Sequence, residues 1–210
     1  THAFVKRYGS PPEKYRMYAS GCVSPRPDLS RLRDIYQWTG GIVMQPRIET
    51  RPRFFVAGYA LTTTNVGGEN NRAIPAFWLE YIQSGKGGRL KQLPGLVSSA
   101  EYGLCMPTDP DADTFTYVIG MQTEDPDAAR AAGLYVAEVP EATYAIFTTP
   151  PAEREAFSEA IQSAWRYVYQ EWFPQSGYQF AQGCADYEYY GEDAGCAKPV
   201  CQIFIPVVRA

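Results

Sequence analysis

Two carboxylates stand among three tyrosines in the run Ala185-Asp186-Tyr187-Glu188-Tyr189-Tyr190 near the C-terminus. The run alternates like a β-strand, and successive side chains of a strand point to opposite faces. Glu188 therefore shares a face with Asp186 and Tyr190, whereas Tyr187 and Tyr189 share the other. A carboxylate among aromatic rings suits a flat, cationic organic molecule, because the rings stack on the cation and the acid supplies the opposite charge. An acidic edge strand that is wet on one side is the competing interpretation.

Aromatic residues are abundant, with 16 Tyr, 10 Phe and 4 Trp. Tyrosine carries a flat ring and a polar tip, so it suits the wall of a pocket as well as an interface. Taken singly, Trp78, Tyr117, Tyr144 and Trp172 are typical core residues. Their part in binding depends on whether they converge with Glu188 on one cleft. A buried carboxylate without a basic partner has a raised pKa and can attract a cation or act as a general base.

Other site chemistries find little support. His2 is the only histidine and lies at a terminus, which argues against Ser-His-Asp and Cys-His catalysis. The five cysteines lack the paired C-x-x-C spacing of zinc sites. Asp109, Asp111 and Asp113 resemble the start of a calcium loop, but the glycine and glutamate that the loop needs are Thr114 and Gly120. The glycine-rich segment 85–89 lacks the order of a phosphate loop. We therefore expect no metal and no cofactor.

The charge is unevenly distributed. Residues 1–53 contain ten Lys and Arg and four Asp and Glu, a balance of +6, and residues 54–210 have a balance of −10. A basic N-terminal segment can contact phosphate, whereas the acidic remainder of the chain repels nucleic acid and favours cations. The odd, irregularly spaced cysteines predict reduced thiols and a cytoplasmic location. We find no signal peptide and no apolar run long enough for a membrane span. The chain starts at Thr1 without a Met, so we expect a fragment of a longer protein.

The elements that must position these residues follow a repeated order from about residue 46. In the first half, we expect a strand at 54–64, a helix at 73–83, a flexible loop at 85–89, and strands at 101–106 and 115–120. The second half predicts a hairpin of 134–139 and 143–148, a helix from 151 to 173 that Pro174 ends, and strands at 185–190 and 201–208. The repeat predicts an α+β fold. Duplicated β-α-β-β units would form an antiparallel sheet, with helices on one face and a central ligand cleft between the halves.

Six stretches follow one another in the order of the GyrI-like effector-binding domain. They are 74–78 (IPAFW), 115–120 (FTYVIG), 139–147 (VPEATYAIF), 171–178 (EWFPQSGY), 186–190 (DYEYY) and 203–207 (IFIPV). The resemblance covers residues 46–210. Residues 1–17, with Phe4, Gly9, Tyr15 and Arg16, resemble the tail of an AraC-type helix-turn-helix domain, and 18–45 would be a linker. The recognition helices are absent, so the resemblance implies DNA binding only through a missing N-terminal domain.

The resemblance implies that the domain binds hydrophobic, often cationic, compounds in its cleft, with the glutamate matched by Glu188 at the centre. The implied ligand-binding residues are Glu188, Tyr190, Tyr117, Tyr144, Trp78, Trp172, Phe204 and Tyr102. On this basis, we expect the sensing domain of an AraC-family transcriptional regulator that binds hydrophobic, aromatic or cationic small molecules over a multidrug range.

Two alternatives stay open. Some relatives hydrolyse the cyclopropane rings of DNA-alkylating natural products, and there Glu188 would be the general base, with Tyr144 beside it as proton donor. A module that binds and occludes another protein is the third interpretation, and an exposed tyrosine patch would favour it. The attached regulator-like tail favours sensing over an enzyme. The sequence leaves the oligomeric state open.

Overall fold

The structure is a computed structural model that describes residues 44–107 and 113–210, all within one compact unit. The expected regulator tail (1–17) and nearly all of the linker (18–45) lie outside the described residues, as do Asp109 and Asp111 of the acidic turn. No helix of the described residues is long and apolar enough to cross a membrane.

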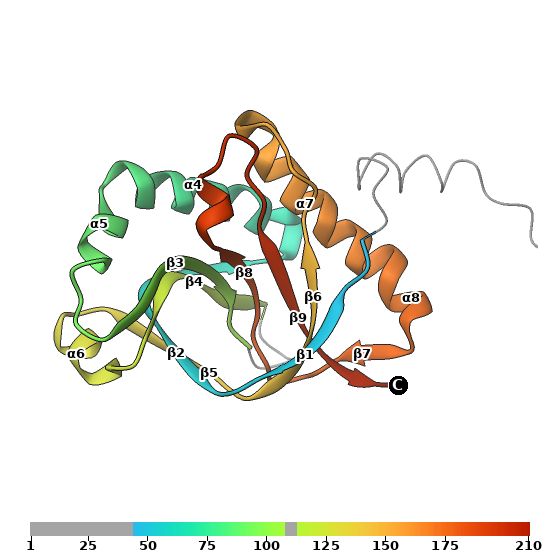
Figure 1. The fold of residues 1–210 in the computed structure, drawn as a ribbon, viewed down its shortest axis with the longest axis horizontal. Coiled ribbons are helices and arrows are strands. Elements are labelled where there is room, and N and C mark those ends of the chain that lie inside the picture. The colour runs from blue at the N-terminus through green and yellow to red at the C-terminus, as the bar shows by residue number, and fades with distance from the viewer. Residues whose placement is uncertain (1–43, 108–112) are drawn as a thin grey trace, which may run out of the picture. The chain divides into compact units, whose positions relative to one another are not determined.

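An antiparallel sheet organises the described chain (Figure 1). Its strands run in the order β1-β6-β9-β8-β3-β4-β2-β5, and β7 pairs with β9 outside this path. The strands are β1 (Arg47–Arg51), β2 (Phe54–Thr64), β3 (Leu96–Cys105), β4 (Thr114–Thr123), β5 (Tyr135–Val139), β6 (Ala142–Thr148), β7 (Tyr178–Phe180), β8 (Asp186–Tyr190) and β9 (Gln202–Arg209).

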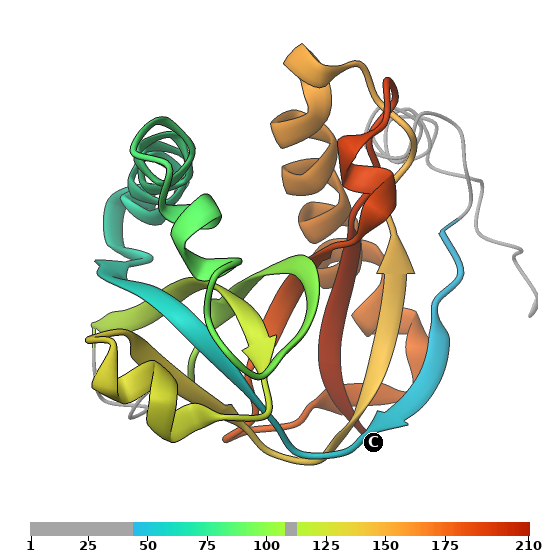
Figure 2. The ribbon, with the colours of Figure 1, turned by 60° about the vertical axis from the view of Figure 1, so that its left-hand side comes forward.

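The helices are short apart from two. They are α4 (Asn70–Gln83), α5 (Lys86–Leu90), α6 (Pro126–Ala131), α7 (Phe157–Tyr167) and α8 (Phe173–Ser176), with 3-10 turns η1 (Val66–Gly68), η2 (Arg154–Ala156) and η4 (Glu192–Gly195) and a π-helical turn η3 (Val168–Trp172). The two long helices, α4 and α7, stand on the same side of the sheet, one over each half (Figure 2). The predicted α+β fold with helices on one face is confirmed.

The predicted duplication is visible in the order of the strands. The first unit is β2-α4-β3-β4 and the second is β6-α7-β8-β9. In each unit the last strand lies between the other two, which gives the neighbours β2-β4-β3 and β6-β9-β8. The two units join where β3 pairs with β8, so these strands form the centre of the sheet. The halves therefore meet at the strand that carries Glu188.

Each long helix packs on a separate core. Beneath α4, Phe77 and Tyr81 contact buried residues of β4, including Ile119. Beneath α7, Ile161 and Ala164 contact buried residues of β6 and β9 in the same way. A third cluster lies on the opposite face of β8 and contains the remaining aromatic residues of the central strands. Because the first two clusters are separate, the space between the helices above β3 and β8 is not filled by core side chains.

The predicted hairpin of residues 134–139 and 143–148 is wrong. Both strands form, but β5 pairs with β2, and β6 pairs with β1 and β9. The pairs Arg51 with Ala142 and Phe54 with Val139 keep one register, so β1–β2 and β5–β6 are two long strands, each interrupted in the middle. Pro52 and Pro140 lie at these interruptions, and proline lacks the N–H that a ladder needs. The proline that indicated a turn instead marks a break within a longer strand pairing.

Two further details of the second predicted helix and the glycine loop are also corrected. Segment 85–89 is not a loop throughout, because Lys86–Leu90 forms the short helix α5 after Gly85, whose φ of 68° is left-handed. Pro174 does not end the long helix, since α8 continues to Ser176 and ends at Gly177 (φ 69°). Pro174 occupies the first turn of α8, directly after the π-helical turn η3.

Candidate functional site

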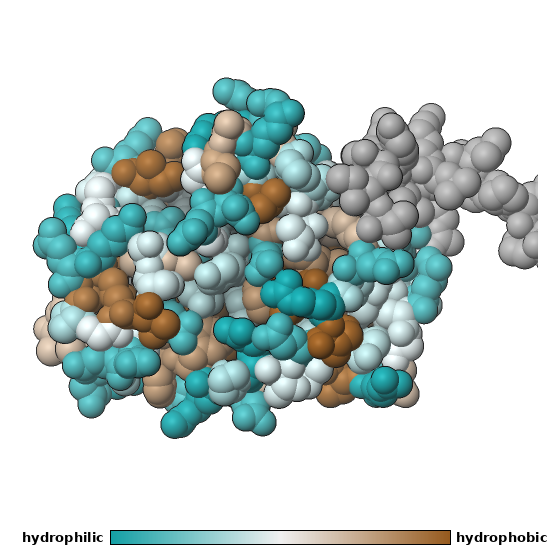
Figure 3. Space-filling view, in the orientation of Figure 1, coloured by the Kyte–Doolittle hydropathy of each residue, from teal (hydrophilic) through white to brown (hydrophobic). Residues whose placement is uncertain are grey.

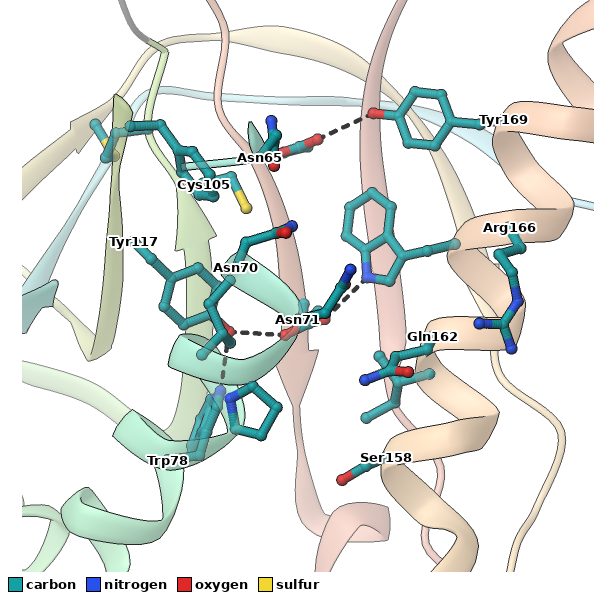
Figure 4. Close-up of a pocket in the computed structure, with 18 of the residues that line it drawn as sticks. Asn65, Asn70, Asn71, Trp78, Cys105, Tyr117, Ser158, Gln162, Arg166 and Tyr169 are labelled. Atoms are coloured by element: carbon teal, nitrogen blue, oxygen red, sulfur yellow. Dashed lines mark hydrogen bonds between the residues drawn. The ribbon is translucent and has the colours of Figure 1, made fainter. Parts of the chain in front are cut away.

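A cleft of about 1280 Å³ opens between α4 and α7. Trp78 comes from α4, Tyr117 from β4 and Cys105 from β3 (Figure 4). The opposite wall carries Gln162 of α7 and Tyr169 of η3, both in the helical segment 157–176 that we call the α7 arm. The floor is formed by the central strands β3 and β8. Helices that rest on separate cores thus leave a hollow at the seam between the two units, with both aromatic and polar groups on its walls.

Glu188 lies at the centre of this cleft and accepts hydrogen bonds from three aromatic side chains. Its Oε2 accepts from the hydroxyls of Tyr117 (2.8 Å) and Tyr190 (3.0 Å). Its Oε1 accepts from the indole Nε1 of Trp165 on α7 (2.9 Å). The bond from Tyr117 is drawn as a dashed line in Figure 4. Donors from both halves of the domain therefore hold one carboxylate in a fixed orientation.

A second layer of residues orients the side chains that donate hydrogen bonds to Glu188. Trp78 Nε1 donates to the hydroxyl of Tyr117 at 2.9 Å, so this hydroxyl accepts from one residue and donates to Glu188. The rings of Trp78 and Tyr190 also meet edge to face at 4.9 Å. Gly103 lies directly opposite Glu188 in the β3–β8 ladder. A Cβ at this position would overlap the Tyr117 hydroxyl and lie 2.9 Å from Glu188 Oε2, so only glycine leaves room for the bond between them.

The electrostatics of the cleft favour a cation. Burial raises the pKa of Glu188, and the hydrogen bonds from Trp165, Tyr117 and Tyr190 oppose that rise. None of the ion pairs among the described residues involves Glu188. Arg166 lines the cleft but pairs with Glu159. A partly buried acid without a basic partner gains most from a positive charge that the protein itself does not supply.

The structure brings together half of the ligand-binding residues expected from the sequence. Glu188, Tyr190, Tyr117 and Trp78 all line the cleft. The predicted division of the 185–190 run also holds, because Asp186, Glu188 and Tyr190 line the cleft while Tyr187 and Tyr189 belong to the cluster on the opposite face.

The other four expected residues do not line the cleft. Tyr144, Tyr102 and Phe204 are buried in the cluster behind β8, where the Tyr144 hydroxyl donates to the carbonyl of Ala185 (3.3 Å). Trp172 packs against Phe147 and Tyr178 in the core beneath the α7 arm. Alternation along β6 places Tyr144 on the face of the sheet that points away from the cleft.

Sequence reasoning did not assign Trp165 and Gly103 to the site. Trp165 belongs to the apolar pattern of the long helix, and its edge position there was the available signal, because an indole at the border of an apolar face can aim its N–H into a neighbouring cleft. The need for glycine at position 103 depends on cross-strand register, which no local pattern encodes. Among the described residues, no group of three or more His, Cys, Asp or Glu side chains could hold a metal ion.

A duplicated α+β fold with an acid at the base of an aromatic cleft defines an effector-binding domain of the GyrI-like type. The model of the Cass2 family, the integron-associated effector binding proteins, matches residues 47–207, and the chain belongs to this family. A comparison with curated proteins finds no match.

Solved structures with the same fold share little sequence with the chain. SAV2435, solved bound to tetraphenylphosphonium, is 20% identical with a TM-score of 0.65, over 79% of this chain and 94% of that chain. A putative transcription regulation protein from Staphylococcus aureus MU50 is 18% identical with a TM-score of 0.58, over 79% of this chain and 99% of that chain. At this identity the likeness establishes the fold, and the residues of the cleft must be argued from the chain itself.

Proposed function

We propose that the domain binds hydrophobic organic cations in the cleft between α4 and α7, as the sensing step of an AraC-type transcriptional regulator. The observation that carries this proposal is Glu188, a carboxylate with three aromatic hydrogen-bond donors and no basic partner in the described chain. Aromatic rings attract a cation through their faces, and the acid adds a direct charge interaction. A cleft of about 1280 Å³ has room for a molecule with several rings.

Membership of an effector-binding family and the N-terminal resemblance to an AraC-type domain support a role in regulation. A ligand changes such an equilibrium only if it binds one arrangement of the regulator more tightly than the other. A cleft whose two walls belong to different halves of the fold provides this difference, because a ligand that touches both walls favours one spacing between them. DNA would be read by a part of the regulator other than the described domain.

The test compares a cation with a neutral molecule of similar shape. We expect tetraphenylphosphonium to bind, since SAV2435 was solved with this ion and shares the fold. Triphenylphosphine oxide serves as the neutral probe. Glu188→Gln should weaken binding of the cation about tenfold to a hundredfold by calorimetry and leave the neutral probe within about threefold. Equal losses for both probes would remove the charge from the proposal.

A matched control separates a local effect from the change in net charge. Glu138→Gln makes the same substitution at an exposed acid of β5 that pairs with Arg53 and does not line the cleft. This variant should bind both probes like the unaltered protein. A loss of cation binding in Glu138→Gln as large as in Glu188→Gln would show that the overall charge, and not the cleft, attracts the ligand.

The hydrolase is the second candidate, and the contacts of Glu188 are the observation in its favour. A carboxylate with a raised pKa can act as a general base, and the hydroxyls of Tyr117 and Tyr190 lie within proton-transfer distance. Tyr144, the donor expected from the sequence, does not line the cleft. Incubation with a cyclopropane-bearing alkylating compound decides between the two functions. Ring-opened product formed over many turnovers supports the enzyme, and unaltered ligand bound in stoichiometric amount supports the sensor.

A further inference from the structure

A second carboxylate lies in the cleft beside Glu188. Asp186 stands two residues earlier on the same face of β8, and both side chains line the cleft. Residues two apart on a strand are roughly 7 Å apart, so the two acids could contact two separate positive charges of one molecule. The proposed function uses Glu188 alone and leaves Asp186 without a role.

Asp186 is held in the same way as Glu188. On the helix side, Tyr169 donates to Asp186 Oδ2 at 3.3 Å, as Trp165 donates to Glu188. The rings of Trp165 and Tyr169, four residues apart, stack with an interplanar angle of 12° and centroids 6.1 Å apart. On the sheet side, the thiol of Cys105 is hydrogen-bonded to Asp186, as Tyr117 is to Glu188. The cleft thus contains two carboxylates on one strand, each with one donor from the α7 arm and at least one from the sheet.

The local backbone also departs from regular structure at this point. Tyr169 belongs to the π-helical turn η3, which follows α7 directly. Single π-turns inside α-helices are rare and occur frequently at functional sites. Tyr169 keeps 48% of its surface exposed, and Asp186 is half-buried where it lines the cleft. A ligand that enters here can replace the Tyr169 hydroxyl as the partner of Asp186.

No ion pair among the described residues neutralises Asp186. Burial raises its pKa to about 7, with a smaller contribution from the charge of Glu188, while hydrogen bonds from Cys105 and Tyr169 oppose the rise. The titratable groups that interact with Asp186 are Cys105 on β3, Tyr144 on β6, Tyr169 on η3 and Glu188 on β8. Two cationic side chains, Arg154 and Arg166, also line the cleft. Arg154 donates to the carbonyls of Gly195 and Cys196, and Arg166 pairs with Glu159.

We propose that Asp186 forms a second cation-binding subsite, so that the cleft selects elongated aromatic dications over monocations with the same ring system. This inference rests on the proposed function, because it takes Glu188 as the partner of the first charge. The ring system would lie against the aromatic wall and place one charge at each acid. The preference should weaken when Asp186 becomes neutral, since a protonated acid offers a hydrogen bond but no charge.

Ethidium and propidium provide the test, because they share one phenanthridinium ring system and propidium adds a quaternary ammonium on a propyl chain. Fluorescence titration at about pH 8 should give a dissociation constant for propidium about tenfold below that for ethidium. Asp186→Asn, which keeps the size of the side chain, should reduce this ratio to about one by weakening propidium alone. Glu188→Gln should weaken both dyes.

Two controls complete the experiment. Asp127→Asn makes the same substitution at an acid of α6 that is 91% exposed and outside the cleft, and it should leave the ratio unchanged. The unaltered protein at about pH 6 should lose most of the preference, because Asp186 is then largely protonated. The pH measurement needs no variant, so it applies even if Asp186→Asn does not fold.

The outcomes separate this inference from the proposed function. If both dyes bind and depend on Glu188, but the ratio is the same in Asp186→Asn and at both pH values, the second subsite is refuted and the sensing function stands. If Asp127→Asn changes the ratio as much as Asp186→Asn, the preference is a general charge effect and the subsite is also refuted. If neither dye binds the unaltered protein, both proposals fall.

Discussion

Gly103→Ala provides a direct test of how the site is built. The glycine lies opposite Glu188 in the central ladder, and its added Cβ would overlap the Tyr117 hydroxyl and lie 3.0 Å from Tyr117 Cζ. Neither the backbone of Gly103 nor the ring of Tyr117 can move easily. The backbone of Gly103 is paired with strands on both sides, and the Tyr117 ring is 1% exposed and is held by Trp78. The substitution should therefore push the hydroxyl away from the carboxylate.

The magnitude follows from three contributions. Loss of a hydrogen bond to a charged group costs about 1.5–3 kcal/mol, and forcing a methyl group into a packed site costs about 1–3 kcal/mol. Replacing glycine within a strand by alanine returns about 0.5–1 kcal/mol of chain entropy. We expect the free energy of unfolding to fall by about 1.5–5.5 kcal/mol, measured by urea denaturation at unchanged m-value. Cation binding should weaken in the same variant, because the orientation of Glu188 is lost.

A double-mutant cycle identifies the cause. Tyr117→Phe removes the hydroxyl that the new methyl group would overlap, so Gly103→Ala should cost at least about 1 kcal/mol less in the Tyr117→Phe background. Gly88→Ala is the matched control, since a Cβ at Gly88 in α5 would meet nothing within 4 Å. That variant should be as stable as the unaltered protein or slightly more stable. Additive costs for Gly103→Ala and Tyr117→Phe would refute the proposed steric conflict.

Two further predictions concern the charges in the cleft. Burial raises the pKa of Asp186 from its ordinary value of 3.8 to about 7, so the folded state holds a proton that the unfolded state releases. This contribution to stability is lost as the pH rises through about 7. Between about pH 5 and pH 8, the unaltered protein should lose about 2 kcal/mol relative to Asp186→Asn in chemical denaturation, and parallel curves for the two proteins would contradict the burial of this acid. Trp165→Phe removes a hydrogen-bond donor that favours the charged form of Glu188, so the pKa of Glu188 should rise further. A carbon-13 NMR titration of the carboxyl group measures this pKa, and an unchanged or lower value would contradict the role of the indole.

Alternation and helical spacing were sufficient to predict much of the fold. The strand at 54–64 was predicted at its observed bounds, and the face shared by Asp186, Glu188 and Tyr190 follows directly from a period of two. Strand partners were not predictable in this way. The segments on either side of Pro140 contain the signals of a hairpin, yet they pair with strands far away in sequence. A proline indicates that the ladder is interrupted, but it does not show whether the chain turns back or continues.

The limits for the site have the same origin. Tyr117 on β4 and Tyr144 on β6 belong to different halves of the fold, but only Tyr117 faces the cleft, while Tyr144 is fully buried behind β8. A one-residue difference in register reverses the face on which a strand residue lies. Family resemblance identifies corresponding segments and does not fix this parity. Exposed apolar residues do not mark the site either, since the apolar side chains on the face shown in Figure 3 form small separate groups among polar ones.

The position of the cleft explains why its chemistry draws on both halves of the fold. Glu188 lies on β8, and its partners Tyr117 and Trp165 belong to the first and second unit respectively. Since α4 and α7 rest on separate cores, the β3–β8 seam is the place where a small change in the angle between the units alters both sides of the carboxylate at once. On the proposed function, a cation beside Glu188 would compete with its hydrogen-bond donors, and a ring bound between Trp78 and Trp165 would contact both sides of the cleft. On the proposed function, binding and the relative placement of the units would be coupled through the same hydrogen bonds, and Tyr117→Phe, which removes one of them, should alter the coupling as well as the affinity.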